Sequence, residues 1–137
     1  MKTKFFYDTY RGEDYYIYTL ENEHLTVGIT DFGAAIQFIK VGGVDIALGF
    51  NSIEERVASG TFAGGTIGRV GNRIKAGDFT LNGRKYHVTC NEGGNHLHGS
   101  VEGFDKKLFD ICGRTADSLT FDYKSPDGEG GIPVLCI

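Results

Sequence analysis

Two stretches of the sequence concentrate side chains that can hold a ligand or move a proton. Residues 68–75 include Asn72 and Arg73, and residues 91–99 include His98. Amide and guanidinium groups donate several hydrogen bonds, and an imidazole can give or accept a proton near neutral pH. Taken singly, such residues are most often exposed polar groups. The argument for a site therefore depends on their combination and on the order in which they occur.

A metal site is one hypothesis for the second stretch. His96, His98 and Glu102 form the pattern H-x-H-x-x-x-E, which resembles the first metal motif of the cupins. On a β-strand the two imidazoles would share one face, about 7 Å apart. A complete ligand set of that kind needs a later histidine, and none follows residue 98. We therefore expect no metal and no cofactor, and a cupin-like metal protein remains only an alternative.

Nucleotides and nucleic acids are poor candidates for the ligand. Gly65, Gly68 and Gly71 are spaced G-x-x-G-x-x-G, which differs from the dinucleotide-binding pattern G-x-G-x-x-G. The stretch from Gly68 to Gly71 also matches a G-x-x-G clamp on a nucleic-acid backbone, but that module needs flanking helices and a basic setting. The net charge is -4 and basic residues form no run. A neutral small molecule is the better expectation.

The composition predicts one all-β domain, or part of one. The chain has 137 residues, 21 glycines, 12% aromatic residues and only 2 prolines. Many glycines between short aromatic and β-branched runs indicate strands joined by tight turns, and no long helical period occurs. The first residues form no apolar signal segment and the chain has no membrane-spanning stretch, so we expect a cytoplasmic protein without membrane contact. Cys90, Cys112 and Cys136 lack a pairing pattern and are expected to be free thiols.

The elements that must position the polar stretches are strands and turns. Alternation of apolar and polar residues predicts a strand at 25–30, and Gly42-Gly43 predicts a hairpin over 34–50. The pair Asn82-Gly83 predicts a second hairpin in which Phe79 pairs with Tyr86. Further expected elements are a short helix at 52–58 capped by Ser52 and Glu55, strands at 107–112 and 119–123, and a turn at 125–128.

The order of the motifs carries a family resemblance. Residues 68–74 read G-R-V-G-N-R-I, 95–99 read N-H-L-H-G, 103–106 read G-F-D-K, and 125–133 read S-P-D-G-E-G-G-I-P. This succession, with the hairpin between its first two members, resembles the aldose 1-epimerase family. Ser100 and Phe109 are modest departures from the family pattern. After Pro133 the match weakens where the family continues into more strands, so we expect residues 1–137 to be the amino-terminal part of a single domain.

The resemblance implies a fold and a reaction. The fold would be an antiparallel β-sandwich of the galactose mutarotase-like (super-sandwich) type, incomplete because the chain is cut short, with exposed strand edges that favour self-association. The reaction would interconvert the α and β anomers of hexoses such as galactose and glucose through acid-base ring opening. By resemblance, Asn72 and Arg73 contact the sugar, and His98 lies near the ring oxygen in support of the general acid.

The resemblance also implies what this sequence does not contain. The family's general acid is a second histidine in an N-H-x-Y/W-F-N-like segment, and its base is a later glutamate; neither segment is present. We therefore expect the isolated 137-residue chain to be catalytically inactive. A non-catalytic sugar-binding protein is an alternative, and an epimerase of phosphorylated hexoses, using Arg69, Arg73 and Lys75, is a weaker one.

Overall fold

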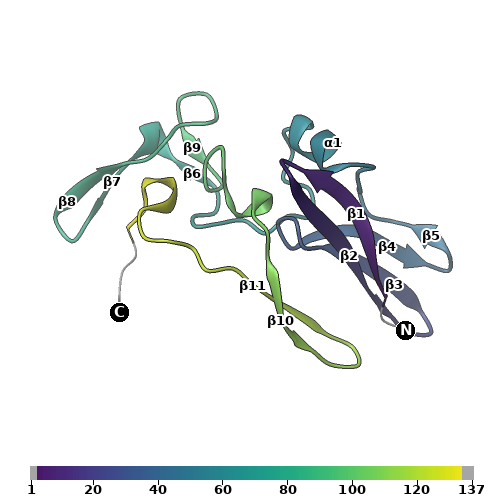
Figure 1. Ribbon diagram of the computed structural model, residues 1–137. Coiled ribbons are helices and arrows are strands. Elements are labelled where there is room, and N and C mark those ends of the chain that lie inside the picture. The colour runs from purple at the N-terminus through teal and green to yellow at the C-terminus, as the bar shows by residue number, and fades with distance from the viewer. Residues whose placement is uncertain (1–2, 134–137) are drawn as a thin grey trace. The chain divides into compact units, whose positions relative to one another are not determined.

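The chain folds into short antiparallel strands. A computed structural model describes residues 3–133 (Figure 1). Every strand pair within them is antiparallel, as the composition predicted. The elements in chain order are β1 (Lys4–Tyr10), β2 (Glu13–Glu21), β3 (Leu25–Thr30), β4 (Ala35–Val41), β5 (Val44–Asp45), α1 (Ile53–Ala58), β6 (Arg73–Ile74), η1 (Lys75–Gly77), β7 (Asp78–Leu81), β8 (Arg84–His87), β9 (His96–Leu97), η2 (Phe104–Lys106), β10 (Asp110–Arg114), β11 (Leu119–Asp122) and η3 (Glu129–Gly131).

These elements form two compact units. The first contains the described residues up to Thr66 together with Asp105–Tyr123, and the second contains Ile67–Phe104 and the described residues from Lys124 onward. The assignment of residues 1–137 to one domain stays a prediction. Among residues 3–133, no helix has the length and apolar character needed to cross a membrane. Cys90 and Cys112 are free thiols, and Cys136 lies outside the described residues.

The first unit is built on a five-stranded sheet in the order β1-β2-β3-β4-β5 (Figure 1). Strand β3 occupies the predicted residues, and the predicted glycine turn joins β4 to β5. Gly42 and Gly43 have φ angles of 56° and 86°, the left-handed values that a primed hairpin turn requires. Both predictions are confirmed.

The second arm of this hairpin is shorter than predicted. Strand β5 ends at Asp45, although the alternating pattern continues to residue 50. One carboxylate oxygen of Asp45 accepts hydrogen bonds from the amides of Ile39 and Ala47, both at 3.1 Å. The side chain thus takes the Ile39 amide out of the ladder, while the Ile46 amide still donates to the Ile39 carbonyl at 2.8 Å, and the strand ends there.

The β1–β2 hairpin, which we did not predict, supplies much of the apolar core. Tyr15 of β2 is buried with Phe32 and Ile53. The Phe32 ring meets the rings of Tyr10 and Tyr15 edge to face, with centroid distances of 5.9 and 5.2 Å. Edge-to-face contact adds to the free energy of apolar burial. The turn at Arg11-Gly12 and the aromatic runs on both sides of it were the signal for this hairpin.

Helix α1 begins at the predicted cap. The Ser52 hydroxyl accepts a hydrogen bond from the Glu55 amide at 3.0 Å. Only half of the expected box forms, because the Glu55 carboxylate accepts from the amide of Asn51 and not from that of Ser52. Arg56 then ties the helix to β4, since its buried guanidinium donates to the Gln37 side chain at 2.8 Å. The helix therefore covers one part of the core.

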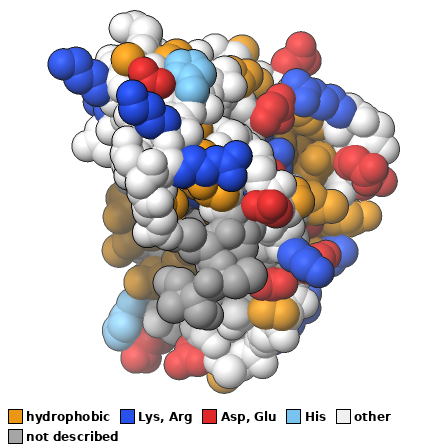
Figure 2. Space-filling view, turned by 90° about the vertical axis from the view of Figure 1, so that its left-hand side faces the viewer, with side chains coloured by type: hydrophobic (Ala, Val, Ile, Leu, Met, Phe, Trp, Pro, Cys, Tyr) orange, Lys and Arg blue, Asp and Glu red, His pale blue; other side chains and the backbone are white. Residues whose placement is uncertain are grey.

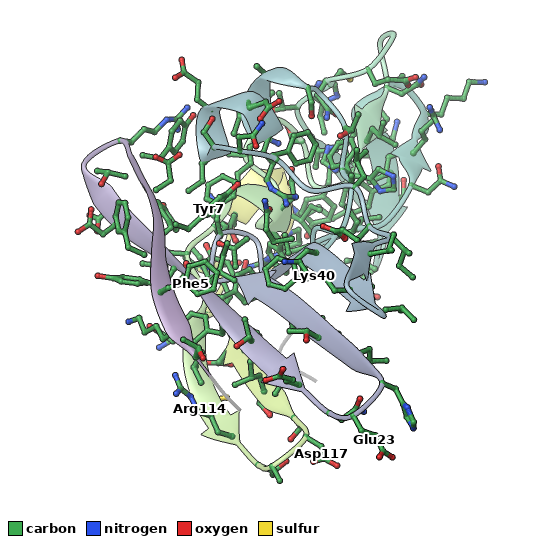
Figure 3. The ribbon with its side chains drawn as sticks, turned by 90° about the vertical axis from the view of Figure 1, so that its right-hand side faces the viewer. Phe5, Tyr7, Glu23, Lys40, Arg114 and Asp117 are labelled. Carbon is green, nitrogen blue, oxygen red and sulfur yellow. The ribbon has the colours of Figure 1, made fainter. Side chains whose placement is uncertain are left out.

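The β10–β11 hairpin packs on the face of the five-stranded sheet opposite Tyr15. Tyr15 and Tyr18 point to opposite faces of β2, because side chains alternate along a strand. The Tyr18 ring meets the Phe121 ring of β11 at 6.0 Å, edge to face. Figure 3 shows the loops that carry Glu23 and Asp117 at the same end of this unit. Strand β11 matches its prediction, whereas β10 begins at Asp110 and not at residue 107 because Leu108 instead bridges Phe32.

The buried Asp31 makes the stability of the first unit depend on pH. Its carboxylate accepts from the Tyr16 amide at 2.9 Å, and burial raises its pKa above 3.8. The folded state then holds the proton more tightly than the unfolded state, so unfolding free energy should fall as pH rises from about 3.8 through the folded pKa. We expect Asp31→Asn to remove this decline in urea titrations over that window. Asp110→Asn, at an exposed position, is the matched control, and an equal pH dependence in both variants would contradict the assignment.

Apolar side chains remain exposed on the first unit, which favours self-association. Hydrophobic side chains also reach the surface, among charged ones, on the β7–β8 side of the molecule, which Figure 2 shows. The large exposed residues of this unit are Phe5, Phe6, Leu25, Val41, Val44, Ile46, Leu48 and Leu108. We expect the 137-residue chain to associate as its concentration rises, and the double variant Phe6→Thr/Val44→Thr to shift it toward monomer in analytical ultracentrifugation. A wild-type chain that sediments as a monomer at every concentration would refute this prediction.

The second unit contains two small strand pairs. Strands β7 and β8 form the predicted Asn-Gly hairpin, in which Phe79 pairs with Tyr86 and their rings stack at 5.2 Å. Asn82 and Gly83 have φ angles of 50° and 76°, so the turn prediction is confirmed. Strand β6 pairs with β9, which joins Arg73 to Leu97. This second pair brings the two polar stretches of the sequence together.

Candidate functional site

The β6–β9 pair gathers all three predicted site residues. Asn72 directly precedes β6, Arg73 begins it, and His98 directly follows β9. The Asn72 amide donates to Nδ1 of His98 at 2.9 Å, and the His98 amide donates to the Asn72 carbonyl at 3.2 Å. These two reciprocal bonds hold the ends of the two strands against each other. The structure thus places Asn72, Arg73 and His98 side by side on one unit.

The bond to the His98 ring fixes its tautomer. A backbone N–H can only donate, so Nδ1 must be the unprotonated nitrogen, and the neutral ring carries its proton on Nε2. His98 therefore offers a directed N–H donor. The geometry has a cost, because His98 and Asn72 have left-handed φ angles of 53° and 66°. Such values cost a non-glycine residue on the order of 1 kcal/mol, although Asn and His tolerate them better than most.

The left-handed φ angle of His98 contradicts the expectation that His96 and His98 share one strand face, on which the metal hypothesis was based. Strand β9 ends at Leu97, so His96 and His98 do not share a strand face. His96 is fully buried, and its Nδ1 donates to the Thr89 carbonyl at 2.9 Å, which makes it a core residue. Within the described part of the chain, no three His, Cys, Asp or Glu side chains are grouped so that they could hold a metal ion.

Glu92 holds the Arg73 guanidinium in place. Nε and Nη2 of Arg73 each donate to a different oxygen of the Glu92 carboxylate, both at 2.9 Å. These bonds raise the pKa of Arg73 and lower the pKa of Glu92. The pair is exposed, so its value lies in orientation more than in stability. Nη1 remains directed toward Asn72, whose side-chain oxygen lies 3.4 Å away.

Glu92 and two asparagines beside it have roles that we did not predict. The Asn91 side chain accepts from the Leu97 amide at 2.7 Å and donates to the Leu97 carbonyl at 3.0 Å, so it imitates a neighbouring strand. Asn95 accepts from the Ala76 amide at 3.1 Å. The signal was present as N-E-G-G-N, in which amide side chains flank a turn and an acid follows an arginine-bearing stretch.

Glycines set the close approach of the backbones around His98. A Cβ atom on Gly99 would lie 1.7 Å from the carbonyl oxygen of Gly68, and one on Gly68 would lie 2.1 Å from the Phe104 ring. Only residues without a side chain fit at these two positions. The G-R, L-H-G and G-F-D-K segments are thus parts of one packed arrangement.

The site offers hydrogen-bond donors at fixed positions. The Arg73 guanidinium carries five N–H groups, more than its bonds to Glu92 and Asn72 use, and the neutral His98 ring carries a proton on Nε2; such donors suit a neutral ligand rich in oxygen atoms. Arg69 and Arg73 each have partners within this unit, at Ser125 and Glu92. They therefore do not form a cluster of unpaired cations suited to a phosphate group.

Comparisons with known proteins concern the chain as a whole. Residues 16–135 match the family model described as aldose 1-epimerase. Galactose mutarotase of Bos taurus is 37% identical over 121 residues, which are 85% of this chain and 35% of that protein. Aldose 1-epimerase of Escherichia coli strain K12 is 33% identical over 128 residues, 89% of this chain and 37% of that protein. The chain thus spans about a third of the length of these curated relatives.

Solved structures show the same fold. The crystal structure of galactose 1-epimerase from Lactobacillus acidophilus NCFM matches with a TM-score of 0.83 and 28% identity, over 97% of this chain and 41% of that one. An aldose epimerase homologue from C. elegans matches with a TM-score of 0.77 and 26% identity, over 96% of this chain and 39% of that one. The predicted fold class is therefore confirmed for this part of the fold.

Proposed function

The chain belongs to the aldose 1-epimerase family, and from this premise we propose that it provides the sugar-orienting side of a site that interconverts the α and β anomers of hexoses such as galactose and glucose. Ring opening needs a base at the C1 hydroxyl and an acid at the ring oxygen. The residues that bind the sugar must hold both atoms in line with those groups.

The observation that carries this proposal is the bond from the Asn72 amide to Nδ1 of His98. It directs a proton on Nε2 outward from the ring. When the C1–O5 bond of a pyranose breaks, negative charge develops on the ring oxygen, and a fixed N–H donor at that oxygen stabilises the charge. His98 thereby supports the general acid and does not replace it.

Arg73 supplies the second grip on the sugar. Its guanidinium is planar, and the bidentate bond to Glu92 restricts its rotation. Less side-chain entropy is then lost when a hydroxyl binds. Asn72 completes the group, because its side-chain oxygen caps the Arg73 amide at 2.9 Å. All three residues would orient the sugar, and the 137 residues hold neither the second histidine segment nor the late glutamate that the family resemblance implies.

Binding of galactose tests the proposal. We expect D-galactose to perturb the amide signals of Asn72, Arg73 and His98 in the ¹⁵N spectrum of the chain, and Arg73→Met to raise the Kd at least about tenfold, because charged hydrogen bonds are lost. Arg84→Met, in the exposed part of β8, is the matched control and should leave the Kd unchanged. Perturbations confined to other residues, or an equal Kd for both variants, would overturn the assignment of the site.

A further inference from the structure

Arg69 belongs to the first polar stretch, yet the proposed function gives it no role. Its guanidinium reaches a segment more than fifty residues away in the sequence. Nε donates to the Ser125 hydroxyl at 2.8 Å, Nη1 donates to the Ile132 carbonyl at 3.0 Å, and Nη2 donates to the Pro126 carbonyl. All three nitrogens therefore bind one short segment, residues 125–132, which we call the glycine segment.

The glycine segment depends on such an anchor. Three backbone hydrogen bonds within it close local turns, from Glu129 to Pro126, from Gly131 to Gly128 and from Ile132 to Glu129, at 2.9–3.2 Å. Three of its residues are glycines with left-handed φ angles between 64° and 82°. Glycine backbones lose the most conformational freedom on ordering, so local turns alone hold such a segment weakly. The planar guanidinium fork of Arg69 adds three long-range bonds to these turns.

The anchored segment lies against the residue that follows His98. A Cβ atom built on Gly130 would lie 3.6 Å from the Gly99 carbonyl oxygen, which is ordinary van der Waals contact. Gly99 also packs against the Gly68 carbonyl, one residue before Arg69. Gly99 thus contacts both Gly68, which precedes Arg69, and the glycine segment that Arg69 binds.

From this arrangement we infer that Arg69 is a positioning residue for the sugar site. By clamping the glycine segment against Gly99, it fixes the turn that carries His98 and so the direction of the Nε2 donor. Only the use of the Nε2 donor at the sugar rests on the proposed function. The mechanical claim, that Arg69 controls the His98 turn, can be tested without any sugar.

The Asn72 amide provides that test, because it donates directly to the His98 ring. We expect Arg69→Lys, which keeps the charge but loses the fork, to speed hydrogen exchange at the Asn72 amide about tenfold and to shift the ¹⁵N resonances of the His98 ring. The amide of Ile46, which donates to the Ile39 carbonyl at 2.8 Å in the first unit, should keep its wild-type exchange rate. Arg84→Lys is the matched control and should change none of these signals.

Two outcomes decide the matter. Faster exchange confined to the amides of Gly131 and Ile132, with Asn72 and His98 unchanged, would show that Arg69 stabilises only the glycine segment, and the inference would be wrong. If Arg69→Lys does not fold, Ser125→Ala removes one of the three bonds and should move the same Asn72 and His98 signals in the same direction. Galactose titration separates the proposed function from the role of Arg69. A wild-type chain that binds no galactose would contradict the proposed function, and the exchange rates would still show whether Arg69 positions the His98 turn.

Discussion

Replacing Gly99 with alanine is expected to destabilise the chain by about 3 kcal/mol or more. The new methyl group would lie 1.7 Å from the Gly68 carbonyl oxygen, far inside van der Waals contact, and the φ angle of +90° is itself unfavourable for alanine. Two backbone segments would have to separate, and the His98 turn would move with them. Urea denaturation followed by far-UV circular dichroism measures the loss, and the amide signal of Asn72 reports the displacement.

Gly83→Ala isolates the backbone term of this prediction. Gly83 also has a left-handed φ angle, +76°, but a Cβ atom there meets nothing within 4 Å. Gly83→Ala should therefore lower the free energy of unfolding by only about 1 kcal/mol, from the backbone conformation alone. If both variants lose the same stability, the close approach at Gly99 has no energetic weight, and our packing argument for the site fails.

We expect the mutarotation of freshly dissolved α-D-glucose to be no faster with the purified 137-residue chain than in buffer alone. Each positioned acid or base contributes about 10²- to 10⁴-fold to such a rate, and in our proposal the residues present would orient the sugar without supplying either group. Polarimetry of the relaxing optical rotation measures this directly. Galactose binding without acceleration would fit both the proposed half-site and a non-catalytic sugar-binding protein.

A host enzyme carried through purification could imitate activity in this assay. The His98→Phe variant, prepared in the same way, controls for it, since a contaminant would accelerate both samples equally. Acceleration that grows with the concentration of wild-type chain and disappears in the variant would contradict the prediction. It would mean that these residues include an acid or base that the sequence did not reveal.

Local signals predicted those parts of the fold that are stabilised locally. The Asn82-Gly83 hairpin, the Gly42-Gly43 turn and the Ser52 cap each need only neighbouring residues, and each formed where predicted. The end of β5 could not be predicted, because it depends on the Asp45 side chain reaching the amide of Ile39 on another strand. Strand β10 shifted for a similar reason, since Leu108 bridges Phe32, which is distant in the sequence.

The site, too, has features that the sequence predicted and features that depend on contacts between distant residues. Motif order placed Asn72, Arg73 and His98 together before any geometry was known, because the family resemblance carries that information. It did not reveal that His98 leaves the strand, which follows from the left-handed turn and removes the shared strand face that the metal hypothesis assumed. The Glu92 contact also depends on spatial pairing across β6 and β9, which no spacing within one stretch encodes.

The left-handed angles of Asn72 and His98 bear on how this chain could be engineered. Glycine would adopt either conformation at a lower free energy, so a selection for thermal resistance alone would favour glycine at both positions. Each such change would discard the polar group that the proposed site needs. Libraries screened for heat tolerance should therefore drift toward variants that fold more firmly and recognise sugar less well, unless ligand capture is part of the screen.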